Sequence, residues 1–85
     1  MKNTSSFAEQ SIAPIRRRIQ KEVYDYLTAY GPSTHQIMEA YFAAHYGPST
    51  IRARCRELVK QGWVKNSGNL GKTKANRPTI IWQVT

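Results

Sequence analysis

The fold is decided by the stretch Ser49–Val64, which reads STIRARCRELVKQGWV. Ile51, Cys55 and Leu58 in this stretch are spaced i, i+4 and i+7, so they share one face of a helix. The residues between them are mostly basic or small. The pattern therefore predicts an amphipathic helix that buries its apolar face and turns a positively charged face outward.

Both ends of this helix carry capping signals. Ser49 or Thr50 supplies a hydroxyl where an N-cap is expected, and Gly62 stands where a left-handed C-cap belongs. The helix is therefore expected to begin at Ser49 or Thr50 and to run to about Gln61.

Two further helices are expected upstream. The first starts near Ser11 to Pro14 and ends at Gly31-Pro32, with an apolar stripe of Ile15, Ile19, Val23, Leu27 and Tyr30. The second follows a capping box of Ser33 and Gln36, with an apolar stripe of Ile37, Tyr41 and Ala44 and with Phe42 adjacent. Both stripes are expected to face one core.

Downstream of Gly62 the residues change from helical spacing to β-branched and aromatic types. Trp63–Lys65 and Thr79–Val84 predict two strands of a hairpin, and both tryptophans are expected to pack against the helices. Between the strands, residues 66–78 predict a long flexible tip that orders on a ligand.

Length and charge limit the class of protein to which the chain can belong. A chain of 85 residues fits one domain, with residues 1–10 as a tail and residues 11–85 as the domain. Thirteen basic residues stand against five acidic ones, a net charge of +8. From residue 49 onward Glu57 is the sole acid, against Arg52, Arg54, Arg56, Lys60, Lys65, Lys72, Lys74 and Arg77. This asymmetry favours a polyanionic partner.

Three helices followed by a two-stranded hairpin, in this order, resemble the winged helix-turn-helix family over residues 15–84. The most specific part is residues 49–64, which resemble the family's recognition helix; Tyr30–Ile37 resembles the turn into the second helix. Cys55 departs from the pattern because the family usually has leucine there. The resemblance implies an α+β fold, a three-helix winged helix-turn-helix with a C-terminal two-stranded β-hairpin (the wing), and a role in transcription regulation.

The chemistry of the third helix also favours double-stranded DNA, because the major groove admits one α-helix. The expected contacts are Ser49 and Thr50 with phosphate, Arg52 and Arg56 with guanine edges, Ala53 as a small residue permitting close approach, and Arg54 and Lys60 with phosphate. Glu57 is expected to pair with Arg54 or Lys60; the alternative is acceptance from cytosine N4. In the wing, Lys65, Lys72, Lys74 and Arg77 are expected on the backbone or in the minor groove.

No pattern of catalysis or metal binding stands out. The spacing of His35 and His45 with the single cysteine fits no zinc motif, and the helical phase of Cys55 predicts a buried thiol. We therefore expect no enzyme activity, no metal and no cofactor. The lone cysteine is typical of a cytoplasmic protein, and the absence of a long apolar run predicts no membrane span. With the expected DNA binding, this predicts a nucleoid-associated protein, and the compactness of the chain makes a prokaryotic or phage regulator one possibility.

Two alternatives remain open from the residues. A winged-helix adaptor for protein–protein interaction would use aromatic helix surfaces around Tyr24 and Tyr41, and aromatic side chains clustered outside would mark a partner surface. A second alternative is RNA or structure-selective nucleic-acid binding. A homodimer or a protein partner is expected to use the first helix and the N-terminal arm.

Overall fold

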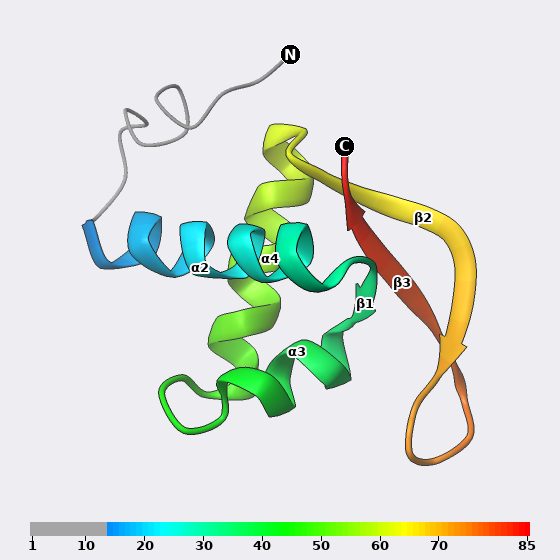
Figure 1. Ribbon diagram of the computed structural model, residues 1–85. Coiled ribbons are helices and arrows are strands. Elements are labelled where there is room, and N and C mark those ends of the chain that lie inside the picture. Colours follow the sequence, from blue (N-terminus) through cyan, green and yellow to red (C-terminus); the bar gives the residue numbers. More distant parts are fainter. Residues whose placement is uncertain (1–13) are drawn as a thin grey trace.

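The computed structural model describes residues 14–85 and shows a small α+β domain with three helices and a three-stranded antiparallel sheet. In chain order these are α2 (Pro14–Tyr30), β1 (Ser33–Thr34), α3 (His35–Phe42), α4 (Pro48–Gln61), β2 (Val64–Lys72) and β3 (Pro78–Val84), as Figure 1 shows. The predicted order of three helices and a hairpin is confirmed. The predicted tail and the start of the first helix at Ser11 lie outside the described residues.

The core lies where the three helices meet the start of the hairpin. Its buried apolar side chains are Ile19, Val23, Tyr26 and Leu27 of α2, Met38 and Phe42 of α3, Ile51, Cys55 and Leu58 of α4, and Trp63 and Val64. The inward face of α4 is therefore the predicted one. Trp63 is buried as expected, whereas Trp82 is only partly buried and packs at the margin of the core.

The apolar stripes predicted for the two upstream helices are only partly correct. Ile15 and Tyr30, at the two ends of the α2 stripe, are exposed, because α2 extends past the core in both directions. In α3 the predicted face is wrong: Ile37 and Tyr41 are exposed, and the buried residues are Met38 and Phe42. The N-cap of α3 is Thr34, whose Oγ1 accepts from the amide of Ile37 at 3.2 Å, and not Ser33.

Ser33 does not cap because α3 begins at His35, one residue later than a Ser33 cap requires, and Ser33 lies in a strand that the sequence did not predict. Ser33 and Thr34 form β1 and pair with Trp82 and Ile81 of β3, which gives the sheet order β1-β3-β2. The two-stranded sheet that we expected is therefore incorrect. This extra pairing fixes the start of α3 against the hairpin.

The hairpin is longer and its tip shorter than predicted. β2 continues to Lys72 and pairs there with Pro78, so most of residues 66–78 is strand and not loop. The register is irregular between Asn66 and Leu70, where Gly68 has a φ of +88°. At the tip, the Thr73 amide donates to the Arg77 carbonyl oxygen at 2.9 Å and the Asn76 amide to the Thr73 carbonyl oxygen at 2.9 Å. The predicted flexible loop is thus a short hydrogen-bonded turn.

Candidate nucleic-acid interface

The outward face of α4 carries the small and basic residues that the helical period places there. Ser49, Arg56 and Lys60 are exposed and Ala53 is partly exposed, opposite the buried Cys55. Among residues 14–85, no carboxylate lies within ion-pair distance of Arg56, so its guanidinium is available to a ligand. This face can approach a polyanion along its length.

The start of α4 differs from the prediction. The helix begins at Pro48 with Gly47 as an N-cap that makes no side-chain hydrogen bond. Neither Ser49 nor Thr50 is the N-cap, so their hydroxyls are not used for this purpose. Proline at the first position removes one amide donor that the helix could not satisfy internally. Ser49 is exposed and Thr50 is partly exposed at this end of the helix.

Arg52 lies on the flank of α4 that faces α3. Its Nε is 3.2 Å from Oε2 of Glu39, and the arginine side chain remains 50 % exposed. The guanidinium is therefore held at one edge by a carboxylate and open to solvent at the other. An arginine in this position can still offer donors to a ligand while its direction is restricted.

Arg54 lies on the other flank, beneath α2, and is not part of the exposed face. Its side chain is only 16 % exposed, and Nη2 donates to Oε2 of Glu57 at 2.8 Å. Oε1 of Glu57 accepts from the buried Gln20 side chain at 2.7 Å. Arg54, expected to contact phosphate, is thus turned into the interface between α2 and α4. The expected ion pair of Glu57 is present, and of its two expected partners Arg54 is the one observed.

Glu57 is held in its ionised form. Burial alone would raise the pKa of Glu57, but hydrogen bonds from Gln20 and Arg54 and the positive charge of Arg54 outweigh it, so that the net pKa is lowered. With both oxygens occupied, Glu57 is not free to accept from a base. Its interaction with Arg54 and Gln20 instead fixes α4 against α2.

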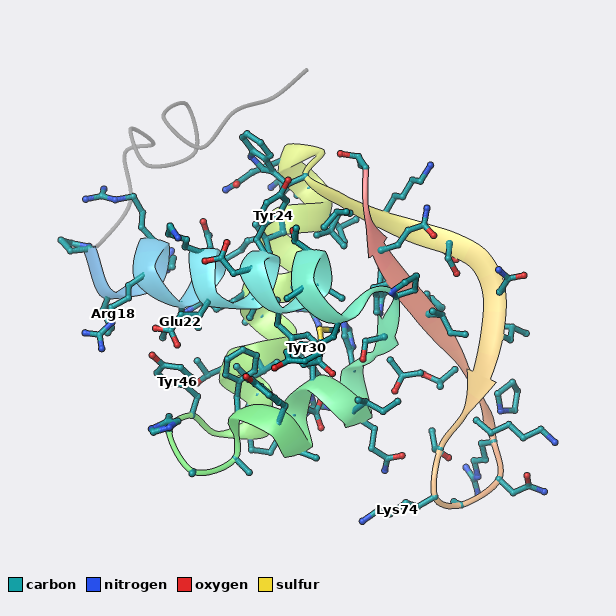
Figure 2. All side chains as sticks on the ribbon, in the orientation of Figure 1. Arg18, Glu22, Tyr24, Tyr30, Tyr46 and Lys74 are labelled. Atoms are coloured by element: carbon teal, nitrogen blue, oxygen red, sulfur yellow. The ribbon has the colours of Figure 1, made fainter. Side chains whose placement is uncertain are left out.

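The tip of the hairpin is anchored beside the first turn of α3. The backbone amide of Lys74 donates to Oε1 of Gln36 at 2.9 Å, and Figure 2 shows the Lys74 side chain extending from the tip. Lys72, Lys74 and Arg77 are all exposed. The hairpin cations are therefore not carried on a free arm but stand in a fixed relation to α3.

His35, next to Gln36, connects this region electrostatically to α4. Burial and the charges of Arg52 and Arg56 lower the pKa of His35, which is therefore near enough to both arginines to feel them. The ring stacks on Trp82 of β3, with centroids 5.2 Å apart and an angle of 16° between the planes. The first turn of α3 thus lies between the hairpin tip and the arginines of α4.

Two of the residues predicted to contact DNA lie away from the hairpin tip. Lys60 and Lys65 stand near the junction of α4 and β2, whereas the hairpin tip lies beyond the opposite end of the sheet (Figure 1). Arg52 and Arg56 influence His35, which is the neighbour of the residue that anchors the tip, whereas Lys60 and Lys65 have no such link to the tip. Both lysines are exposed.

Glu39, Gln36 and His35 belong to this region, although they were not predicted as site residues. All three lie on α3, and their contacts depend on how α3 packs against α4 and the hairpin. The sequence indicated a capping role for Gln36, but its side chain instead accepts a hydrogen bond from the amide of Lys74, which lies 38 residues away in the chain. No local pattern indicates such a contact.

Within residues 14–85, no three His, Cys, Asp or Glu side chains are placed to hold a metal ion. None of the described helices is long and apolar enough to cross a membrane. No protein-family model, no curated protein and no solved structure matches this chain.

Proposed function

We propose that the domain is a winged helix-turn-helix module that binds double-stranded DNA, with α4 in the major groove and the β2–β3 hairpin as the wing. The sequence-specific form of this binding, and a role in transcription regulation, are part of the proposal. The proposed function is binding alone, without catalysis.

The observation that carries the proposal is that α3 contacts both basic elements: the hairpin tip through Gln36 and α4 through Glu39. The backbone amide of Lys74 donates to the Gln36 side chain, which leaves the Lys74 ammonium group exposed. The neighbouring His35 lies within electrostatic reach of Arg52 and Arg56. Two basic elements that are distant in sequence are thereby held in a fixed relation across one turn of α3. A duplex offers two phosphate backbones beside each groove, so it suits a helix flanked by a second basic element.

The distribution of acidic groups supports the same ligand. Each acidic side chain within residues 14–85 is already paired with a cation: Glu22 with Arg18, Asp25 with Lys21, Glu39 with Arg52 and Glu57 with Arg54. No unpaired carboxylate of the described chain therefore opposes phosphate at the surface formed by Arg56, Lys72, Lys74 and Arg77. The potential there is positive and attracts a polyanion.

Within this arrangement the residues divide by task. Arg56 and Arg52 are suited to guanine edges, with a discrimination of about 1–3 kcal/mol for each bidentate contact. Lys72, Lys74 and Arg77 are suited to phosphate, which adds affinity without sequence preference. Ser49 and Thr50 can donate to phosphate from the start of α4, and Lys60 and Lys65 extend the positive surface beyond the main contact.

Backbone amide shift mapping during titration with a duplex tests this function. We expect perturbations along residues 49–56 of α4 and residues 72–77 of the hairpin, with the exposed face of α2 unaffected. Competition with an RNA duplex distinguishes DNA from general nucleic-acid binding. The absence of perturbation by either duplex at low salt contradicts the proposal.

A further inference from the structure

An aromatic surface lies between α2 and α3. Tyr30 is 66 % exposed and Tyr41 is 54 % exposed, and their ring centroids lie 5.6 Å apart. The buried Tyr26 contacts both rings, at 5.0 Å and 4.6 Å. Together with Ala29, Phe42 and the acidic residues Glu22 and Asp25, these rings line an open cavity of about 320 Å³. Exposed aromatic rings gathered in this way, with polar groups at their border, are typical of a site for protein association.

α2 carries a regular stripe that borders this cavity and is exposed except at the half-buried Glu22. Ile15, Arg18, Glu22, Asp25 and Ala29 are separated alternately by three and four residues, the spacing of a helix–helix seam. Ile15 is 56 % exposed, although it is large and apolar. Figure 2 shows Arg18 and Glu22 on the edge of α2 that faces Tyr46, with Tyr24 on the opposite edge.

The charges of the stripe are arranged for self-association. Its amino-terminal half carries Arg18 and its carboxyl-terminal half carries Asp25, so two copies in antiparallel orientation place opposite charges against each other. The same orientation places Ile15 of one copy against Ala29 of the other. Ala29 is small and lines the cavity together with the tyrosines, so the space can receive an isoleucine side chain.

We propose that two copies of this chain associate through antiparallel α2 helices, with Ile15 of each copy inserted into the Tyr26–Tyr30–Tyr41 cavity of the other. At the two-fold axis the two Glu22 carboxylates meet, and each has Arg18 of its own helix at 3.4 Å and the Tyr46 hydroxyl at 2.9 Å to offset the repulsion. The two-fold axis generates the same contact twice, so the assembly is complete as a dimer.

This surface is separate from the one proposed for DNA. On α3, Tyr41 lies on the flank towards α2, whereas Glu39 lies on the flank that pairs with Arg52 of α4. A dimer formed through α2 therefore leaves α4 and the hairpin accessible in both copies. The inference goes beyond DNA binding and does not depend on it.

Sedimentation equilibrium of the protein without DNA tests this association. A single helix pair buries less than about 1,200 Å², so we expect a Kd on the order of 10–100 μM. Ile15→Glu should weaken the dimer at least tenfold, while its thermal unfolding in dilute solution stays unchanged because Ile15 is exposed in the monomer. Leu70→Glu is the matched control, since Leu70 is 67 % exposed on the distant β2 strand.

A charge exchange makes the test specific to the antiparallel arrangement. Arg18→Asp and Asp25→Arg should each weaken the dimer, and the double variant should restore it. A protein that stays monomeric at about 500 μM overturns the proposal. Equal effects of the Ile15 and Leu70 substitutions, or no restoration in the double variant, overturn it as well. Because no DNA is present, these outcomes leave the proposed DNA binding unaffected.

Discussion

Oε2 of Glu39 on α3 lies 3.2 Å from Nε of Arg52 on α4. This contact joins the two helices beside the proposed DNA surface, and it restrains an arginine that we expect to read a base. The carboxylate also places a negative charge close to where phosphate is expected. Glu39 therefore has opposite effects on general affinity and on base selectivity.

Glu39→Gln should raise the affinity for an unrelated duplex and lower the ratio of specific to unspecific binding. The amide removes a repulsive charge and releases Arg52, which can add up to about 0.9 to the slope of log K against log salt. The free energy of unfolding should change by less than about 1 kcal/mol, because the pair is partly exposed. Anisotropy titrations at several salt concentrations measure both effects.

The control for this prediction is the double variant Glu39→Gln, Arg52→Gln. If Arg52 mediates the gain, the double variant should bind the unrelated duplex no more tightly than the single Arg52→Gln variant with its native Glu39. A weaker affinity of Glu39→Gln for unrelated DNA contradicts the expected role.

Arg56 and Lys74 should respond differently to truncation. Arg56→Ala is expected to cost about 1–3 kcal/mol on the preferred sequence and much less on others. Lys74→Ala should weaken all sequences equally and reduce the salt slope by about 0.9. Lys21→Ala is the matched control, because Lys21 lies on α2 and pairs with Asp25. Equal losses on every sequence for Arg56→Ala contradict a reading role.

The hydrogen bond between the Lys74 amide and Gln36 should hold the wing in position. Gln36→Ala removes the acceptor, so the Lys74 amide should exchange faster with solvent deuterons, while amides in the centre of α4 keep their protection. Affinity for DNA should fall by about 1 kcal/mol or less, because a looser wing must be ordered on binding. Gln36→Glu retains an acceptor and should retain slow exchange. Unchanged exchange at Lys74 in Gln36→Ala contradicts the anchoring.

The Cys55 thiol should make stability depend on pH in alkaline solution. Burial raises the pKa of Cys55 from 9.0 to about 12. Below pH 9 the thiol is protonated in both the folded and the unfolded chain, so it does not make the free energy of unfolding depend on pH. Between pH 9 and 12 the unfolded chain loses this proton first, so the free energy of unfolding falls by about 1.4 kcal/mol per pH unit. Urea unfolding of wild type and Cys55→Ala at pH 8 and about pH 10 isolates this component, because other groups titrate in both proteins.

Cys55→Ala should be less stable than wild type by about 1 kcal/mol at pH 7, since it opens space in the core. The difference between the two proteins should shrink as pH rises above 9 and be lost by about pH 10. A difference that stays constant up to about pH 10 shows that the thiol is accessible to ionisation in the folded state.

The parts of the fold that depend on local periodicity were predictable from the sequence. Ile51, Cys55 and Leu58 define the inward face of α4, and the outward position of Arg56 follows from the same period. Gly62 was predictable as the C-cap, with a φ of 86°. Each of these features is determined within one or two helical turns.

The features that depend on distant contacts were not predictable. Ser33 and Thr34 resemble a cap in sequence, and only the proximity of β3 makes them a strand. The inward face of the short α3 helix is set by its angle to α4, so Met38 is buried in place of Ile37. The helical period predicts that Arg52 and Arg54 lie on opposite flanks of α4. It does not predict which carboxylate each arginine pairs with.

The central claim is that α4 reads duplex DNA while the wing binds its backbone. Selection of bound sequences from a random duplex pool tests it most directly, carried out with wild type and with the Arg52→Ala, Arg56→Ala double variant. We predict that wild type enriches a guanine-containing motif and that the double variant loses the motif while still binding DNA at low salt. Recovery of the unselected pool by wild type, or the same motif from both proteins, contradicts the account.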